Sequence, residues 1–153
     1  MRKVLIAVDD TKGSKDAVDV FLNVYTCMKP ETVVLLHVQK PEGRALIDEM
    51  LGEPELATLK QALRGTTVQE MLDRKAQMVL DSFQKTLADH GVMGIKAVVQ
   101  FGHPAEQILK IAAEEGVEMI IIGSRGKRTH GFLMGSVSRE IANSCEIPVL
   151  IAR

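Results

Sequence analysis

The stretch EMIIIGSRGKRTHGFLMGSVS, residues 118–138, joins a run of apolar residues to two groups of glycine and serine. The apolar run ends at Gly123 and is typical of a buried strand that leads into a loop. Gly135 and Ser136 then open a short helix predicted over residues 137–145, with Ser136 as its N-cap. Strand, loop and helix start together predict a phosphate cradle, because free N–H groups and the positive end of the helix dipole face an anion there.

The loop itself carries residue types that suit phosphate binding. Gly123 and Gly126 can adopt positive φ, and without a Cβ they let another molecule approach their backbone closely. Three basic residues add positive charge to the same loop: Arg125, Lys127 and Arg128. The alternative is a loop that only connects a strand to a helix, because short glycine motifs also occur by chance.

The rest of the chain alternates strands with helices. Continuous apolar runs predict four further strands, at residues 3–8, 32–38, 95–101 and 147–152. Helical spacing predicts three further helices: 15–28 with Ser14 as its cap, a helix opened by a capping box at Thr67–Glu70 and stopped by Gly91, and 104–115. Residues 39–65 are broken by proline and glycine and are expected to form a flap over one end of the sheet.

Strands that are apolar on both faces and alternate with helices predict an α/β fold, a parallel sheet with helices on both sides. The 153 residues suit a single domain, spanning 1–153. Parallel strands end at the same edge of such a sheet, and ligands bind beyond that edge where the strand order reverses. Asp9 and Asp10 end the first strand, and Gly123 ends the fourth. The sequence therefore predicts a crevice between these two strand ends.

Gly123, Gly126, Gly135 and Ser136 stand where the universal stress protein family has Gly-x2-Gly-x9-Gly-Ser/Thr, although eight residues rather than nine separate Gly126 from Gly135. The resemblance extends over the whole chain: it includes the first strand ending in Asp9, Leu36-His37-Val38, the Gly102-His103-Pro104 turn and the last strand after Pro148. It implies a single doubly wound five-stranded parallel sheet of order 3-2-1-4-5. In that order the first and fourth strands are neighbours, which agrees with the predicted crevice.

The resemblance also implies a ligand, ATP or AMP, with Mg²⁺ as an optional addition. In nucleotide-binding members the position of Asp9 is associated with the ribose, the positions of Ala7, Val8 and Val38 surround the adenine, and the glycine loop holds phosphates. The expected binding residues are Ala7, Val8, Asp9, Val38, Gly123, Ser124, Arg125, Gly126, Gly135, Ser136, Val137 and Ser138.

Several of these residues have a simpler interpretation. Asp9 could cap the following turn, but we expect Asp10 to do this and to leave Asp9 for the ligand. The two carboxylates could instead chelate Mg²⁺. His37 lies within an apolar strand and is expected to be a hydrogen-bonded core residue.

Three classes of function remain. The first is a cytosolic adenine-nucleotide-binding stress protein that acts through ligand occupancy and homodimer contacts at its last strand, or, without nucleotide, as an interaction protein. The second is an ATP-hydrolysing or phosphate-transferring enzyme on the same fold, although no Walker lysine motif and no nucleophile with an adjacent base occurs. The third is a phosphoacceptor receiver domain, which needs an aspartate after the third strand, where Gly102-His103-Pro104 stands.

Composition narrows the partners and the compartment. The net charge of −1 argues against a nucleic-acid-binding surface, which needs concentrated positive charge. No apolar run reaches membrane-spanning length, so no membrane partner is expected. Cys27 and Cys145 are expected to be free thiols, as in the reducing cytoplasm.

Overall fold

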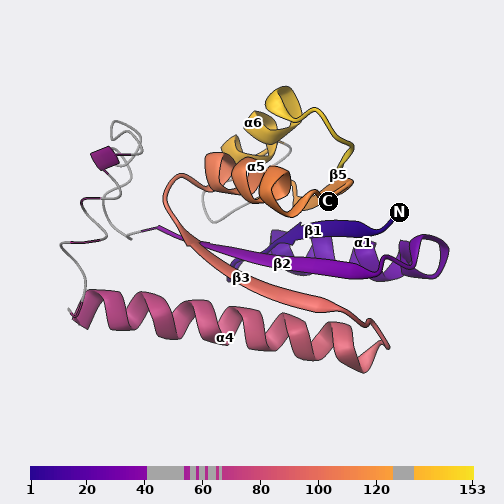
Figure 1. Cartoon of the computed structure of the whole chain (residues 1–153), viewed down its shortest axis with the longest axis horizontal. Helices are drawn as coiled ribbons and strands as arrows, with labels where there is room; N and C mark the ends of the chain where they lie inside the picture. The colour runs from indigo at the N-terminus through magenta and orange to yellow at the C-terminus, as the bar shows by residue number, and fades with distance from the viewer. Residues whose placement is uncertain (41–53, 56–57, 59–60, 62–64, 66, 126–132) are drawn as a thin grey trace.

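The computed structural model describes residues 1–40, 54–55, 58, 61, 65, 67–125 and 133–153. Within them five strands form one sheet in the order β3-β2-β1-β4-β5, and every neighbouring pair is parallel (Figure 1). The strands are β1 (Lys3–Ala7), β2 (Thr32–Gln39), β3 (Ile95–Phe101), β4 (Met119–Gly123) and β5 (Val149–Ala152). The predicted sheet and strand order are confirmed. The expected flap over residues 39–65 lies almost wholly outside the described residues.

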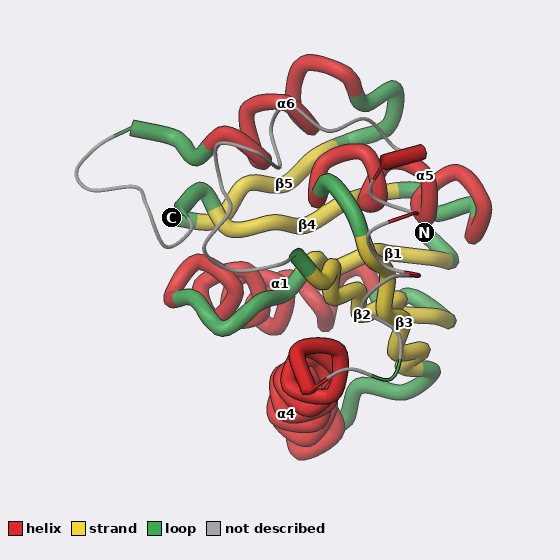
Figure 2. Tube along the Cα trace, turned by 90° about the vertical axis from the view of Figure 1, so that its left-hand side faces the viewer, coloured by secondary structure: helices red, strands yellow, loops and turns green. Residues whose placement is uncertain are grey.

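Helices cover both faces of the sheet, as Figure 2 shows, with α1 and α4 on one side and α5 and α6 on the other. Their bounds are α1 (Lys12–Met28), α4 (Thr67–Asp89), α5 (Pro104–Glu115) and α6 (Ser136–Ser144). Strand β1 shows why the sheet needs both layers, because successive side chains point to opposite faces. Val4 and Ile6 pack in the core with α1 and α4, whereas Leu5 and Ala7 pack in the core with α5 and α6.

Two predicted helix caps are wrong by a few residues. Helix α1 begins at Lys12 with Thr11 at the N-cap position, so Ser14 lies inside the first turn and caps nothing. Helix α6 begins at Ser136, and Gly135 is its N-cap with φ −62° and ψ 157°. The Gly135 carbonyl already accepts the Arg139 N–H at 3.1 Å. An N-cap residue has extended dihedrals and a carbonyl that takes the first helical hydrogen bond, and Gly135 satisfies both conditions.

The long helix α4 matches its predicted boundary at the C-terminal end but not at the N-terminal end. Thr67 is already helical, so it is not the N-cap that the predicted capping box requires, and the residue before it lies outside the described residues. Val68 in the first turn of the helix is 48% exposed. At the other end Gly91 has φ +77°, and its N–H donates to the Ala88 carbonyl at 2.9 Å. A left-handed glycine after the last turn ends the helix as predicted.

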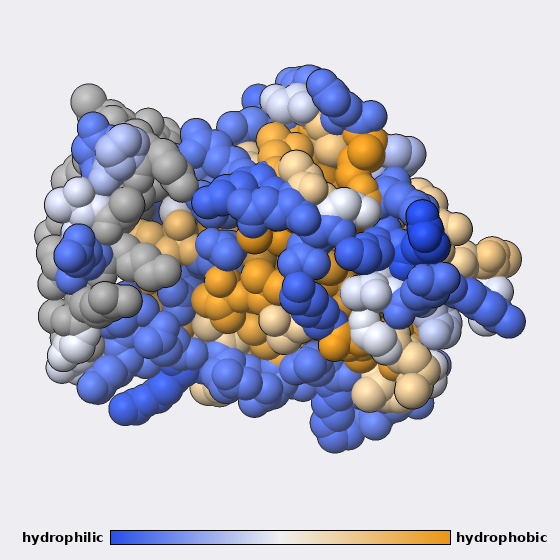
Figure 3. All heavy atoms as spheres, in the orientation of Figure 1, coloured by the Kyte–Doolittle hydropathy of each residue, from blue (hydrophilic) through white to orange (hydrophobic). Residues whose placement is uncertain are grey.

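The edges of the sheet are less covered than its centre. Contacts from α4 fall mainly on β2, and Val99 on β3 is 42% exposed. On β5, Val149, Leu150 and Ile151 are half-buried. Figure 3 shows apolar atoms at the surface in the middle of this face, over the region where Figure 1 draws β3 and α5. The outer strands therefore depart from the prediction that nearly all strands are buried on both faces.

None of the helices in the described part of the chain is long and apolar enough to span a bilayer.

Candidate functional site

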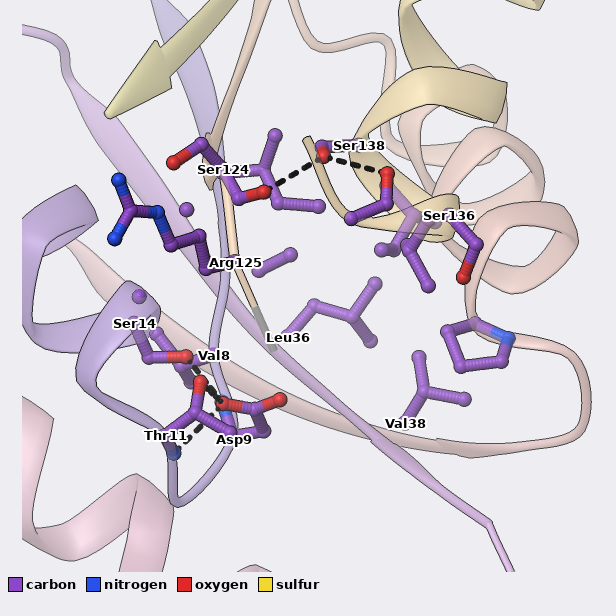
Figure 4. A pocket seen from close by; sticks show the side chains of 18 of the residues that line it. Val8, Asp9, Thr11, Ser14, Leu36, Val38, Ser124, Arg125, Ser136 and Ser138 are labelled. Atoms are coloured by element: carbon purple, nitrogen blue, oxygen red, sulfur yellow. Dashed lines mark hydrogen bonds between the residues drawn. The ribbon is translucent and has the colours of Figure 1, made fainter. Parts of the chain in front are cut away.

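A cavity of about 330 Å³ opens at the carboxyl edge of the sheet, at the ends of β1 and β4 (Figure 4). Its size falls in the range of small-molecule sites, roughly 300–1,000 Å³. The expected binding residues that the structure describes all line it: Ala7, Val8, Asp9, Val38, Gly123, Ser124, Arg125, Gly135, Ser136, Val137 and Ser138. Gly126, also expected there, lies outside the described residues.

The cavity has further walls that the sequence analysis did not identify. They are Thr11, Gly13, Ser14, Leu36, Lys40, Pro104, Ile108 and Ile122. Leu36 and Ile122 were predictable from the alternation of side chains along a strand. Leu36 lies two residues before Val38, and Ile122 lies two residues before Ser124. Lys40 follows Val38 by two residues at the same strand end, so the alternation of side chains was a usable signal for it as well. Ile108 comes from a helix, and only the packing of α5 brings it to the cavity.

Asp9 holds the turn between β1 and α1. Its Oδ1 accepts hydrogen bonds from the Thr11 N–H at 2.9 Å, from the Thr11 hydroxyl and from the Ser14 hydroxyl at 2.7 Å. The Asp9 N–H in turn donates to Ser14 Oγ at 2.7 Å. The turn was assigned to Asp10 from the sequence, and that assignment is wrong. The other oxygen of Asp9, Oδ2, accepts no hydrogen bond from the described residues, so this half of the carboxylate is still available to a ligand.

Asp10 turns away from Asp9 toward α4. Its Oδ2 lies 3.3 Å from Nζ of Lys75 on α4, and both side chains are partly exposed. With one carboxylate in the α1 turn and the other in this ion pair, Asp9 and Asp10 do not form the chelating pair considered for Mg²⁺. No cluster of metal-binding side chains occurs among the residues that the structure describes.

Gly123 is required by the fold itself. Its φ is not in the left-handed region, contrary to the expectation. A Cβ on Gly123 would overlap the carbonyl group of Gly13 in the first turn of α1, and a Cβ on Gly13 would overlap the Arg125 carbonyl. The two glycines thus let the α1 turn and the end of β4 touch backbone to backbone. The space expected for a ligand beside the missing Gly123 Cβ is filled by this chain.

The start of α6 presents free hydrogen-bond donors to the cavity. The first four N–H groups of a helix, counted from the N-cap, have no partner within it. At α6 the Gly135 N–H donates to the Ser124 carbonyl at 2.6 Å, which leaves the N–H groups of Ser136, Val137 and Ser138. Gly135 itself is therefore not among the donors, although it was expected to be. Three N–H groups at the positive end of a helix dipole form a site for an anion.

Ser124 and Ser138 fix the position of this helix start. The buried Ser138 hydroxyl lies 3.0 Å from the Gly135 carbonyl oxygen and 3.3 Å from that of Ser124, and it donates to these acceptors. The Ser124 N–H donates to the Ala152 carbonyl on β5 at 2.7 Å. Figure 4 shows Ser124, Ser136 and Ser138 together, with Asp9, Thr11 and Ser14 gathered apart from them. Two polar groups thus face a common space.

The opposite end of the cavity has a free backbone edge at Val38. On β2 the even-numbered residues bond toward β1, as the Val8 N–H shows by donating to the Leu36 carbonyl at 2.8 Å. The β1–β2 ladder ends at the pair Ala7 and Leu36, two residues before Val38. The Val38 N–H and C=O therefore point past the end of β1 and have no hydrogen-bond partner among the described residues. One donor and one acceptor stand side by side at the cavity wall.

His37 is a structural residue, as predicted. It is 5% exposed, and its Nδ1 lies 2.9 Å from the Val8 carbonyl oxygen, so the ring donates a hydrogen bond there. With its N–H bonded to Leu36, Val8 has no main-chain group left to offer a ligand. Of the two valines expected at this wall, Val38 rather than Val8 carries free polar backbone.

The universal stress protein family matches residues 1–153. The chain belongs to the universal stress protein family. Universal stress protein MJ0577 of Methanocaldococcus jannaschii is 29% identical over 99% of this chain and 94% of its own length. The solved structure of MJ0577 superposes with a TM-score of 0.75 at the same coverage. Universal stress protein YxiE of Bacillus subtilis is 26% identical over 99% of this chain and 98% of its own.

Two more distant structures share the fold of this universal stress protein and contain nucleotides. A universal stress protein in complex with cAMP has a TM-score of 0.67 and 18% identity over 99% of this chain and 97% of its own. The universal stress protein of Archaeoglobus fulgidus in complex with dAMP has a TM-score of 0.64 and 15% identity over 100% and 98%. Identities this low establish a common architecture, and the ligands are properties of those two proteins.

Proposed function

We propose that this universal stress protein binds adenine nucleotides in the cavity between β1 and β4. The observation that carries the proposal is the pairing of two free backbone sites across one cavity, the N–H groups of Ser136, Val137 and Ser138 and the N–H and C=O of Val38. The first suits a phosphate. The second suits the edge of adenine that offers one acceptor and one donor, N1 and the 6-amino group. The nucleotide complexes of two relatives by fold support this choice.

The rest of the cavity fits the parts of the ligand that lie between these ends. Leu36 and Ile108 provide apolar surface for the base, and Asp9 Oδ2 is placed to accept from a ribose hydroxyl. Binding in the micromolar range, about −8 kcal/mol, is expected. We propose binding rather than turnover, because the sequence shows no nucleophile with an adjacent base, and the Ser14 and Ser138 hydroxyls at the cavity both donate to protein acceptors. ATP and AMP are both candidate ligands, and Mg²⁺ stays an optional addition to them.

The test removes one phosphate donor without disturbing the helix. Proline is well tolerated at the first helical position, and the residue before it must be extended, which Gly135 is with ψ 157°. Ser136→Pro therefore deletes one N–H, and Ser136→Ala, which keeps the N–H, is the matched control. Hydrogen bonds to charged groups contribute about 1.5–3 kcal/mol, so AMP should bind roughly tenfold or more weakly to the proline variant.

Titration calorimetry on nucleotide-free protein gives the readout. Adenosine, which lacks the phosphate, should bind both variants equally, and IMP, which reverses the donor and acceptor at positions 1 and 6, should bind more weakly than AMP. The same titration with ADP and ATP ranks the phosphate number. No heat from any adenine compound, or equal AMP affinity in the two variants, would contradict the proposed site.

We further propose that the protein is a cytoplasmic homodimer joined along β5. Strand β5 is an edge of the sheet, and its apolar residues Val149, Leu150 and Ile151 are only half-buried. Exposed apolar edges favour pairing with a second copy, and two-fold dimers are the commonest oligomers. Cys27 and Cys145 are both free thiols, which supports the reducing compartment.

A further inference from the structure

A second cavity of about 150 Å³ adjoins the first on the side of α4. The two cavities share Asp9, Val38, Lys40 and Pro104, so they meet along the ends of β1 and β2. The second is completed by residues that the first lacks: Asp10, His37, Leu72 and Lys75. Nothing in the proposed binding of a nucleoside monophosphate uses this space.

Four charged side chains line the second cavity, the carboxylates of Asp9 and Asp10 and the ammonium groups of Lys40 and Lys75. Lys40 and Lys75 bring two ammonium groups to a small space, from the end of β2 and from α4. Lys75 is already engaged by a carboxylate, because Asp10 Oδ2 lies 3.3 Å from its Nζ. Ion pairs between partly exposed side chains contribute little to stability, so a ligand anion of higher charge can take the place of Asp10 beside Lys75.

Asp9 determines which part of a nucleotide would reach this cavity. In the proposed pose the 5′-phosphate lies at the start of α6, and the ribose hydroxyls lie at Asp9. Asp9 also lines the second cavity, so a group attached to one ribose hydroxyl would extend across it toward Lys75. The other hydroxyl would remain to donate to the Asp9 carboxylate.

We propose that the second cavity is a subsite for a phosphate on the ribose, so that the crevice takes adenosine phosphorylated at the 2′ or 3′ position as well as at 5′. The inference rests on the proposed function, since it extends the same ligand. Lys75 is its specificity-determining residue, because Lys75 lines only the second cavity whereas Lys40 lines both.

The experiment compares AMP with adenosine 3′,5′-bisphosphate and adenosine 2′,5′-bisphosphate by titration calorimetry at low salt. One of the two bisphosphates should bind wild-type protein about tenfold more tightly than AMP, since charge-assisted hydrogen bonds to phosphate are strong. Lys75→Gln should abolish this gain and leave AMP affinity unchanged. Lys85→Gln is the matched control, because Lys85 is an exposed lysine of the same helix that pairs with Asp89 instead.

Asp10→Asn separates a binding role of Lys75 from a structural one. If Asp10 competes with the ligand for Lys75, its neutralisation should raise bisphosphate affinity above that of wild type. If the ion pair only holds α4 in place, Asp10→Asn and Lys75→Gln should lower affinity together. Parallel losses would overturn the inference, as would a bisphosphate gain that survives in Lys75→Gln or AMP binding with no bisphosphate gain. Absence of AMP binding would end the proposed function and this inference with it.

Discussion

Replacing Gly123 by alanine should destabilise the protein by about 3 kcal/mol, although it adds only one methyl group. The new Cβ would lie 2.6 Å from the Cα of Gly13 and closer still to its carbonyl group. Two carbons pack best at about 3.5–4.0 Å, so the α1 turn and the end of β4 must separate by roughly 1 Å. A gap of that size already forfeits a quarter to a half of the dispersion attraction between the separated surfaces. Overpacking costs of 1–3 kcal/mol are typical, and backbone on both sides places this site at the upper end.

Urea unfolding followed by circular dichroism measures this loss, and the melting temperature should fall by roughly 6–12 °C. Gly13→Ala should behave similarly, because its Cβ would meet the Arg125 carbonyl at the same contact. The double variant should lose clearly less than the sum of the two, since one separation relieves both overlaps. Gly91→Ala is the control, because its Cβ meets nothing within 4 Å. The variant should lose only the stability that a left-handed backbone costs an alanine, and its nucleotide affinity should be unchanged. A loss below about 0.5 kcal/mol for Gly123→Ala would refute this reasoning.

Two further predictions concern the α1 turn and the proposed dimer. Ser14→Ala removes both the acceptor of the Asp9 N–H and a donor to Asp9 Oδ1. It should lower the free energy of unfolding in urea by about 1–3 kcal/mol and weaken AMP binding more than adenine binding. Unchanged stability would show that the turn holds without the Ser14 hydroxyl. Val149→Glu or Ile151→Lys, whichever side chain lies at the proposed interface, should convert the dimer to a monomer in light scattering, whereas a concentration-independent monomer of the wild-type protein would exclude the dimer.

The sheet was predictable because its signals are local and repeated. Continuous apolar runs of strand length alternate with amphipathic helices, and this pattern admits few topologies once crossovers are right-handed. Gly91, Pro104 and Gly116 marked helix ends that the structure reproduces. The two misplaced caps have a shared cause, because serine is favoured at caps in general. At α6 the glycine before Ser136 takes the extended conformation, and at α1 the hydroxyl of Ser14 bonds to Asp9 instead.

The site was predictable as a location and less so as chemistry. The residues that line the cavity follow from strand ends, but which polar atoms remain free depends on partners far away in the sequence. Val8 loses its carbonyl to His37 on another strand, and the Gly135 N–H is taken by Ser124. Asp9 and Asp10 are chemically identical neighbours, yet Asp9 holds the turn and Asp10 forms an ion pair with Lys75 on α4. No periodicity or motif encodes that contact.

The hydrogen bond from the Gly135 N–H to the Ser124 carbonyl, at 2.6 Å, holds together the two ends of the connection from β4 to α6. Changing the number of residues between two such fixed ends alters the closure free energy by about (3/2)RT ln of the length ratio, which for the ten residues between Ser124 and Gly135 in place of eleven is roughly 0.1 kcal/mol. The shortened segment between Gly126 and Gly135 is therefore almost free of thermodynamic consequence for the position of α6. The length of this segment can therefore change between members of the family while the start of α6, with its three free N–H groups, stays where the sheet holds it.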